Sequence, residues 1–164
     1  MSHEICALVV AGQVDASKAH SVGLRAVLVH EGVSVFPINH YFSAYWAAKR
    51  GNSALLDLPE GLSLVFPTEA VLRDLVCEVT VTDRRRFAII ETNYFGGVGD
   101  QGAVAFDGEE RLTPERASIN QALAALGVRA TGTMDEFEVI GLTGFRHNPE
   151  YLDAYVELCE ELGV

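Results

Sequence analysis

The chain has 164 residues, of which 49% are hydrophobic and 21% charged, a length and composition typical of one globular domain with a single core. Its 12 Lys and Arg against 23 Asp and Glu give a formal net charge of −11, which disfavours general binding to nucleic acid or to anionic membranes. Three widely spaced cysteines and an N-terminus without signal-peptide character predict reduced thiols in a cytoplasmic protein that has no membrane span.

The first quarter of the chain predicts buried strands and a hairpin. The unbroken apolar run over residues 5–11 predicts a strand that is covered on both faces. Residues 13–23 carry mixed signals that fit either a loop or a short helix. Two valine-rich runs, 24–30 and 33–38, flank a Glu-Gly pair and predict a hairpin. A helix over 17–30 is the alternative for the first of these runs.

The second quarter predicts two helices and two short strands. Asn39 is placed to cap a helix that runs to about Arg50, and the aromatic residues of this helix favour core packing over the wall of a ligand pocket. Residues 62–66 end at a proline and predict an edge strand. Thr68 predicts the cap of a helix to about residue 76, and the alternation over 78–82 predicts a half-exposed strand. The aromatic residues of the first helix are Tyr41, Phe42, Tyr45 and Trp46.

The last third predicts two further helices. Thr113 followed by Pro114 is a typical helix start, and we expect this helix to end at Gly127. Residues 131–143 fit a short strand or one turn of helix. The last helix begins near residues 148–150 and ends at Gly163. The whole chain therefore predicts one α+β domain over residues 1–164, with about five to seven mostly antiparallel strands and three or four amphipathic helices mainly on one face.

A glycine-rich segment lies between two apolar runs, in the sequence FAIIETNYFGGVGDQGAVAF over residues 87–106. We interpret it as a strand, a seven-residue loop over 96–102 that contains four glycines, and a second strand. Residues 97–102 match the pattern GxGxxG, but that pattern binds dinucleotides only where the glycines open a helix. These glycines lead into a strand. The loop is therefore either a bulged hairpin, which we favour, or a backbone nest whose N–H groups hold an anion.

One polar pair in this segment is a candidate for chemistry. The two-residue period of a strand puts Glu91 and Asn93 on the same side as apolar neighbours. Glu91 is then either a buried carboxylate with a raised pKa and a partner such as Arg146 or Arg129, or a carboxylate at the sheet margin, which we favour. Glu91 is the candidate acid or base. The candidate ligand-binding residues beside it are Asn93, Tyr94, Gly97, Gly99, Asp100 and Gln101.

Other charged and reactive groups form no recognisable motif. The basic run over 84–86 favours a solvated turn over a phosphate site, and the acidic run over 135–138 favours a solvated turn over a Mg²⁺ or Ca²⁺ site. The five histidines lack zinc-ligand spacing, and no serine or cysteine lies in a nucleophile motif. We therefore expect no metal and no cofactor.

Two functions remain after these exclusions. The first is a non-catalytic binding or inhibitor-type module that uses its acidic surface to bind a basic protein, because opposite fields steer association. The alternative is a small enzyme or ligand sensor, in which Glu91 acts as acid or base and the loop over 96–102 binds a small anionic ligand. The sequence leaves the ligand, the partner and the oligomeric state open.

Overall fold

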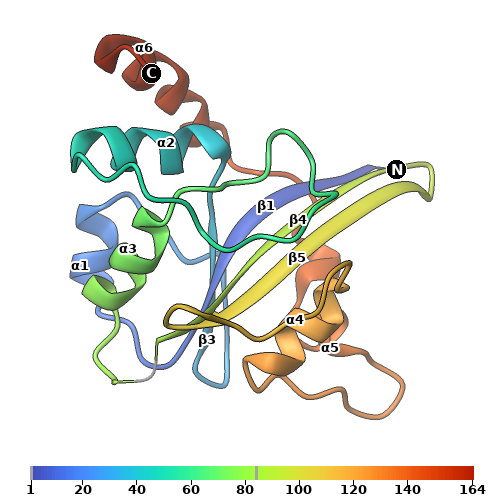
Figure 1. Cartoon of the computed structure of the whole chain (residues 1–164). Coiled ribbons are helices and arrows are strands. Elements are labelled where there is room, and N and C mark those ends of the chain that lie inside the picture. The colour runs from blue at the N-terminus through green and yellow to red at the C-terminus, as the bar shows by residue number, and fades with distance from the viewer. Residues whose placement is uncertain (1, 84) are drawn as a thin grey trace.

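The strand β1 (Ser2–Ala11) lies near the middle of a six-stranded sheet with the order β2-β3-β1-β4-β5-β6, in which every neighbouring pair is antiparallel (Figure 1). The computed structural model describes residues 2–83 and 85–164. The other strands are β2 (Leu28–His30), β3 (Val33–Pro37), β4 (Arg86–Phe95), β5 (Val98–Asp107) and β6 (Glu110–Arg111). The helices are α1 (Ala16–Ser21), α2 (His40–Lys49), α3 (Val71–Val79), α4 (Ile119–Ala125), α5 (Glu136–Val139) and α6 (Ala154–Leu162), with 3-10 turns at Leu142–Gly144 and Glu150–Asp153.

Hydrophobic clusters fill both sides of the sheet, which explains why the β1 run is continuously apolar. On one side Leu8 and Phe106 pack in the same cluster as Leu75 of α3, and on the other Ile90 packs in one cluster with Leu123 of α4. Figure 1 shows α1, α2 and α3 on the first side, with α6 outermost against α2, and α4 and α5 on the second. The predicted α+β class is confirmed. The helices lie mainly on one face, as expected, and α4 and α5 cover the other.

The predicted hairpin between β2 and β3 is confirmed, with its turn at Glu31 and Gly32, both in the left-handed region. The strand β2 is shorter than the predicted 24–30, because Leu24 is buried in the core cluster and does not continue the ladder. The alternative helix over 17–30 is wrong, since the helix in this region, α1, ends at Ser21. Residues 13–23 therefore contain the short helix that was one of their two interpretations.

Two predicted strands of the second quarter are wrong. Residues 78–82 do not form a strand, because α3 continues to Val79, which is buried with the apolar face of the helix. Residues 62–66 form an irregular loop in which Leu64 is fully exposed. The cap of α3 is also misplaced in the prediction. The helix begins at Val71 after Ala70, and the Thr68 hydroxyl donates to the neighbouring Glu69 carboxylate.

The start of α4 differs from the prediction because a stronger cap lies downstream. Ser118 and Gln121 form a reciprocal capping box, so the helix begins at Ile119 and not at Thr113. The Thr113 hydroxyl instead accepts a hydrogen bond from the backbone N–H of Ala105 at 3.1 Å. The last helix is confirmed, with a 3-10 first turn before α6. Within the described residues, the helices are too short or too polar for any of them to traverse a lipid bilayer.

Candidate functional site

The glycine-rich segment is a tight hairpin, so the seven-residue loop predicted over 96–102 is wrong. Only Gly96 and Gly97 form the turn, with φ of +60° and +79°, and β5 begins at Val98. Gly99 lies in β5, where a Cβ atom would come within 1.9 Å of the Asn93 carbonyl oxygen. Gly102 also lies in β5, where a Cβ would touch the side chain of Leu62 at 3.0 Å. Close packing of the backbone therefore accounts for these glycines, and no loop is left to form the predicted anion nest.

The ladder register divides the predicted ligand-binding residues between the two faces of the sheet. Asn93 is paired with Asp100, and both lie on the same face as Glu91. Tyr94 and Gln101 lie on the opposite face, where the Gln101 amide donates to the Tyr94 hydroxyl at 3.1 Å. The predicted residues therefore do not converge on one site.

Glu91 and Asn93 do share a cleft, which we call the Glu91 cleft. It has a volume of about 460 Å³ and lies where β1 and β4 meet the start of α2, the loop around Ser63 and the segment around His147. Its lining residues are Glu4, Ile5, Cys6, Asn39, His40, Ser63, Val65, Glu91, Thr92, Asn93, His147 and Asn148.

Two asparagines build the walls of the cleft. Asn39 accepts a hydrogen bond from the Phe42 N–H at 2.8 Å, which caps α2, and donates to the carbonyl of Leu152 at 3.2 Å. Asn148 accepts from the Cys6 N–H at 3.1 Å and donates to the carbonyl of Ile38 at 2.9 Å. These amide groups therefore hold backbone segments together and are engaged before any ligand arrives.

The segment that contains Asn148 also closes the free edge of β1. Beyond the end of β3, the N–H of Glu4 donates to the carbonyl of Arg146 at 2.8 Å, and a parallel bridge joins Glu4 to His147. The Arg146 guanidinium donates to the carbonyl of Ser2 at 3.0 Å. This short segment thus acts as a partner for the outer half of β1 and fixes one wall of the cleft.

The Glu91 carboxylate is half-buried and accepts a hydrogen bond from the Ser63 hydroxyl at 2.6 Å. In the described parts of the chain it forms no salt bridge, and the suggested partner Arg146 bonds to the backbone of Ser2 instead. Arg129, the other suggested partner, is exposed and does not line the cleft. Glu91 accepts a hydrogen bond, as the favoured interpretation expects, but it does not lie at the sheet margin, because β4 is an interior strand that pairs with both β1 and β5 at this residue.

The cleft carries negative charge. Glu4 and Glu91 line it, and none of its lining residues is Lys or Arg. Burial and, to a smaller extent, the Glu91 carboxylate raise the pKa of the Cys6 thiol, so this group stays protonated and is a poor nucleophile. The cleft therefore favours a cationic group over an anionic one.

The rim of the cleft is apolar. The loop that supplies Ser63 continues into Leu64, which is fully exposed, and Val65, which is half-exposed.

The aromatic residues of α2 lie elsewhere, because Phe42 is in the core and Tyr45 packs against Tyr155 of α6. The aromatic residues of α2 therefore serve mainly in packing, as favoured from the sequence.

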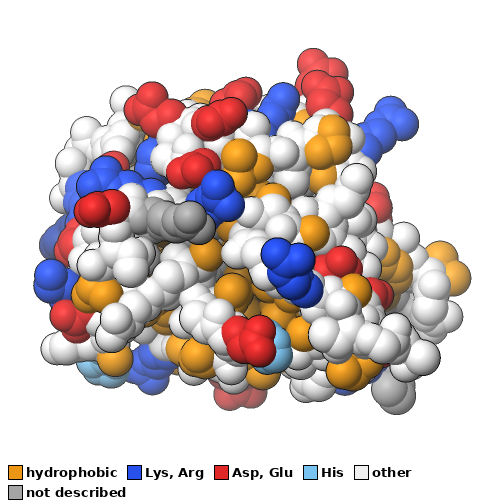
Figure 2. All heavy atoms as spheres, turned by 90° about the horizontal axis from the view of Figure 1, so that it is seen from below, with side chains coloured by type: hydrophobic (Ala, Val, Ile, Leu, Met, Phe, Trp, Pro, Cys, Tyr) orange, Lys and Arg blue, Asp and Glu red, His pale blue; other side chains and the backbone are white. Residues whose placement is uncertain are grey.

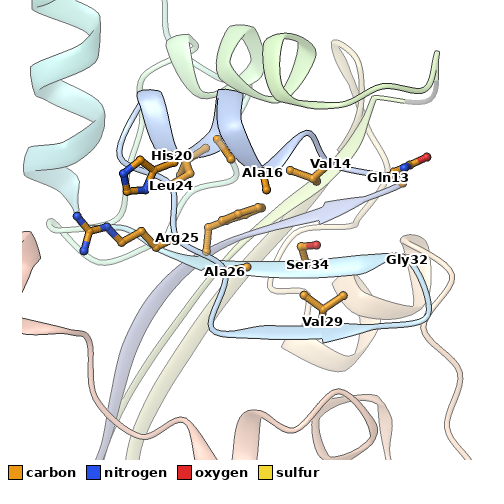
Figure 3. A pocket seen from close by; sticks show the side chains of 13 residues that line it. Gln13, Val14, Ala16, His20, Leu24, Arg25, Ala26, Val29, Gly32 and Ser34 are labelled. Atoms are coloured by element: carbon orange, nitrogen blue, oxygen red, sulfur yellow. The ribbon is translucent and has the colours of Figure 1, made fainter.

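A second cavity, of about 510 Å³, lies between α1 and the β2–β3 hairpin (Figure 3). The sequence did not predict this cavity, because its residues come from the segment 13–23, which fitted either a loop or a helix, and from the β2–β3 hairpin. The signal that could have revealed it is a set of small residues at facing positions, Ala16 and Ala19 on α1 and Ser34 on β3. Small residues on both walls leave space between them.

The charged runs have structural roles. Asp135 caps α5 and accepts a hydrogen bond from the Asn120 amide at 3.1 Å. In the basic run, Arg86 pairs with Asp107 at 3.2 Å, while Arg84 lies outside the described residues. Over the described ranges, no group of three or more His, Cys, Asp or Glu side chains is arranged to hold a metal ion.

Comparison with known proteins gives no relative. No family model, no curated protein and no solved structure matches the chain. A functional proposal therefore rests on the cleft, its charge and its apolar rim.

Proposed function

We propose that the protein is a non-catalytic binding module for a basic protein partner, and that the Glu91 cleft receives a lysine or arginine side chain of that partner. The observation that carries the proposal is the charge of the cleft, which is lined by two carboxylates and two histidines and by no Lys or Arg. Cys6 is paired with Glu91 across the ladder, so Glu4, two residues earlier in β1, is the diagonal neighbour of Glu91 at ~7 Å. A cationic group between the two carboxylates would interact with both.

The rim of the cleft supports a protein as the partner rather than a free ion. Val65 lines the cleft together with the two carboxylates, and its neighbour in sequence, Leu64, is fully exposed. Protein interfaces combine such an apolar contact with a few charged anchors, and arginine is enriched among the anchors. A partner segment with an apolar residue beside its basic residue would cover both features at once.

The C-terminal region, which follows the cleft residue Asn148 in the sequence, is also acidic. It begins two residues after Asn148 and contains no Lys or Arg. Figure 2 shows a different pattern on the face seen from below, where acidic and basic side chains are interspersed. A basic partner would therefore be steered towards the side that carries α6 and the cleft. The acidic residues of the region, all exposed, are Glu150, Asp153, Glu157, Glu160 and Glu161.

The enzyme or anion-sensor alternative has less support. An anionic ligand in the cleft would meet two carboxylates, and the predicted anion nest is replaced by a two-residue turn. The one thiol in the cleft, Cys6, is held protonated by burial.

The test compares two blocked tripeptides, Leu-Arg-Leu and Leu-Glu-Leu, as probes in amide NMR titrations at low ionic strength. Addition of the arginine peptide should shift the amides of Glu91, Asn93 and His147, and the glutamate peptide should not. Glu91→Gln should weaken binding of the arginine peptide about tenfold, since it removes one of the paired charges.

The matched control is Glu109→Gln. Glu109 is exposed at the turn between β5 and β6, and its substitution changes the net charge by the same amount. Its affinity for the arginine peptide should stay within about twofold of the unchanged protein. Equal losses in the two variants would show attraction by net charge alone and would contradict a specific cleft. Equal binding of the two peptides would also contradict it.

A further inference from the structure

We propose that the cavity between α1 and the β2–β3 hairpin binds a small anionic amphiphile, a molecule with an apolar body and one carboxylate head. We call it the α1 cavity. It shares no lining residue with the Glu91 cleft, so this site is independent of the proposed partner site. Its volume of about 510 Å³ is within the range of small-molecule sites in proteins.

The walls of the α1 cavity are apolar and are made by short elements. Phe36 of β3 and Val29 of β2 form one wall, and Ala16 and Ala19 of α1 form the opposite wall. Figure 3 shows α1 crossing above the two strands with the space between them. The cavity opens to solvent, since Val29 is 69% exposed, and its mainly apolar lining favours a ligand with an apolar body.

Ser34 provides a polar group without a partner on the cavity wall. Its exposed fraction is 7%, and among the residues that the structure describes its hydroxyl forms no hydrogen bond. Figure 3 shows the side chain rising from β3 on the side of α1. The residues opposite it in the ladders are Val10 and Val29, which offer no side-chain acceptor. The Ser34 oxygen is not among the fully buried unpaired side-chain atoms of the described residues, so it is accessible from the cavity and can donate to a ligand oxygen there.

The charge of the α1 cavity is opposite to that of the Glu91 cleft. Figure 3 shows His20 and Arg25 together at one end of the cavity, away from Gln13 and Gly32. No lining residue is Asp or Glu. A cationic end on an apolar cavity selects a molecule with an anionic head.

The Arg25 guanidinium is held in place but keeps its donors available. Its central carbon lies 4.7 Å from the centre of the Tyr151 ring, a cation–π contact, and its N–H groups form no hydrogen bond within the described residues. Within the described chain it has no salt bridge, although the protein carries a net charge of −11. The N–H groups at the edge of a guanidinium match the two oxygens of a carboxylate. The head of the ligand would therefore bind at Arg25 and its body would lie along Leu24 and Phe36.

The test uses three probes of equal chain length, octanoate, octanol and octylamine, in amide NMR titrations of the full chain. Octanoate should shift amides of α1 and of the β2–β3 hairpin, and octylamine should not. Arg25→Gln should weaken octanoate binding about tenfold and leave octanol unchanged, because only octanoate uses the guanidinium. Lys49→Gln, which removes an exposed cation at the end of α2, should change octanoate binding by less than about twofold.

A second variant tests the cavity itself. Ala16→Phe places a large side chain in the space and should abolish binding of octanoate and octanol. Arg25 is exposed, so Arg25→Gln keeps the fold and remains decisive even where the phenylalanine variant fails to fold. The proposal is overturned if millimolar octanoate leaves α1 and the hairpin unshifted, if octylamine binds as well as octanoate, or if Arg25→Gln leaves octanoate binding intact.

Discussion

The hydroxyl of Ser63 donates a 2.6 Å hydrogen bond to the carboxylate of Glu91, and this bond ties an exposed loop to a central strand of the sheet. The loop contains the two apolar residues of the cleft rim, Leu64 and Val65. Because Ser63 is exposed and Glu91 only half-buried, the bond contributes little to overall stability. Its main effect is to position the loop and the carboxylate relative to each other.

The first prediction concerns this bond. Ser63→Ala should lower the free energy of unfolding by about 0.5–1 kcal/mol and should speed amide hydrogen exchange at Leu64 and Val65. Ser53→Ala is the control, since Ser53 is exposed and makes no side-chain hydrogen bond that the described residues show. Urea unfolding and hydrogen exchange by NMR measure the two effects. Unchanged exchange in the Ser63 variant would show that the loop is held by other contacts.

The second prediction concerns the backbone at Gly99. A Cβ at this position would come within 1.9 Å of the Asn93 carbonyl oxygen, which belongs to the partner strand and cannot move alone. Gly99→Ala should therefore lower the free energy of unfolding by roughly 2–3 kcal/mol. Gly144→Ala should change it by less than about 0.5 kcal/mol, because nothing lies within 4 Å of the added carbon and its φ is not in the left-handed region. Urea denaturation of the two variants is decisive, and equal effects would contradict the steric account.

The third prediction concerns the buried histidine of β1. His3 donates from Nε2 to the Leu142 carbonyl at 2.9 Å, so its Nδ1 accepts from the Thr92 hydroxyl at 2.7 Å. The same hydroxyl accepts from the Ile5 N–H at 3.1 Å. Thr92→Val leaves the buried Nδ1 of His3 without a partner and removes one acceptor from the Ile5 N–H, so it should reduce stability by about 2–3 kcal/mol. Thr92→Ser keeps the hydroxyl and should lose only about 1 kcal/mol with the methyl group.

Thermal and urea unfolding of the two Thr92 variants measure this difference. An equal loss in the serine and valine variants would mean that the methyl group, and not the hydrogen-bond network, accounts for the effect.

The fourth prediction concerns alkaline pH. Burial raises the pKa of Tyr155 and of Tyr151 above the ordinary value of 10.0, because a phenolate is disfavoured in an apolar environment. The neutral phenols therefore stabilise the fold fully below pH 10. As the pH rises further, the unfolded chain loses these protons first and stability falls. Burial raises the pKa of the Cys6 and Cys159 thiols above 9.0, so they act in the same direction.

Tyr155→Phe removes one of these phenols. Its free energy of unfolding should therefore decline less steeply than that of the unchanged protein between pH 9 and pH 11, as measured by urea unfolding at each pH. Parallel declines in the two proteins would show that Tyr155 does not contribute to the alkaline loss.

Local patterns were sufficient for the elements whose context agrees with them. The continuous apolar run predicts β1 without an alternative, and the hairpin that turns at Glu31 and Gly32 is the favoured of two interpretations; both predictions are confirmed. The alternation of apolar and polar residues over 78–82 fits two structures, a strand or the end of a helix, because Val79 also continues the apolar face of α3. The helix forms because the apolar face of α3, including Val79, is buried against the core. At α4 the capping box at Ser118 is a better helix start than Thr113, whose hydroxyl is used by the sheet.

The site was predictable only where it follows the strand period. Strand alternation correctly puts Glu91 and Asn93 on one face, but the other walls of their cleft come from distant segments. Asn39 and Asn148 reach the cleft through long-range backbone contacts that have no local pattern. The glycines misled the prediction for the same reason. Gly99 and Gly102 are needed because other segments of the same chain pack closely against them, and not because of a loop conformation.

The closure of β1 by the segment around Arg146 and Asn148 has a consequence during synthesis. β1 is made early, but its neighbour β4 begins at residue 86, and its outer half gains its last backbone partner at residues 146–148. At ordinary translation rates this delay is on the order of ten seconds. β3 follows soon after β1 and can pair with its inner half, but the edge that faces β4 stays unpaired until residues 86–95 are made, and the outer half of the other edge until residues 146–148. Until those later segments are made, the unpaired edges of β1 are sites at which the growing chain can pair with another chain.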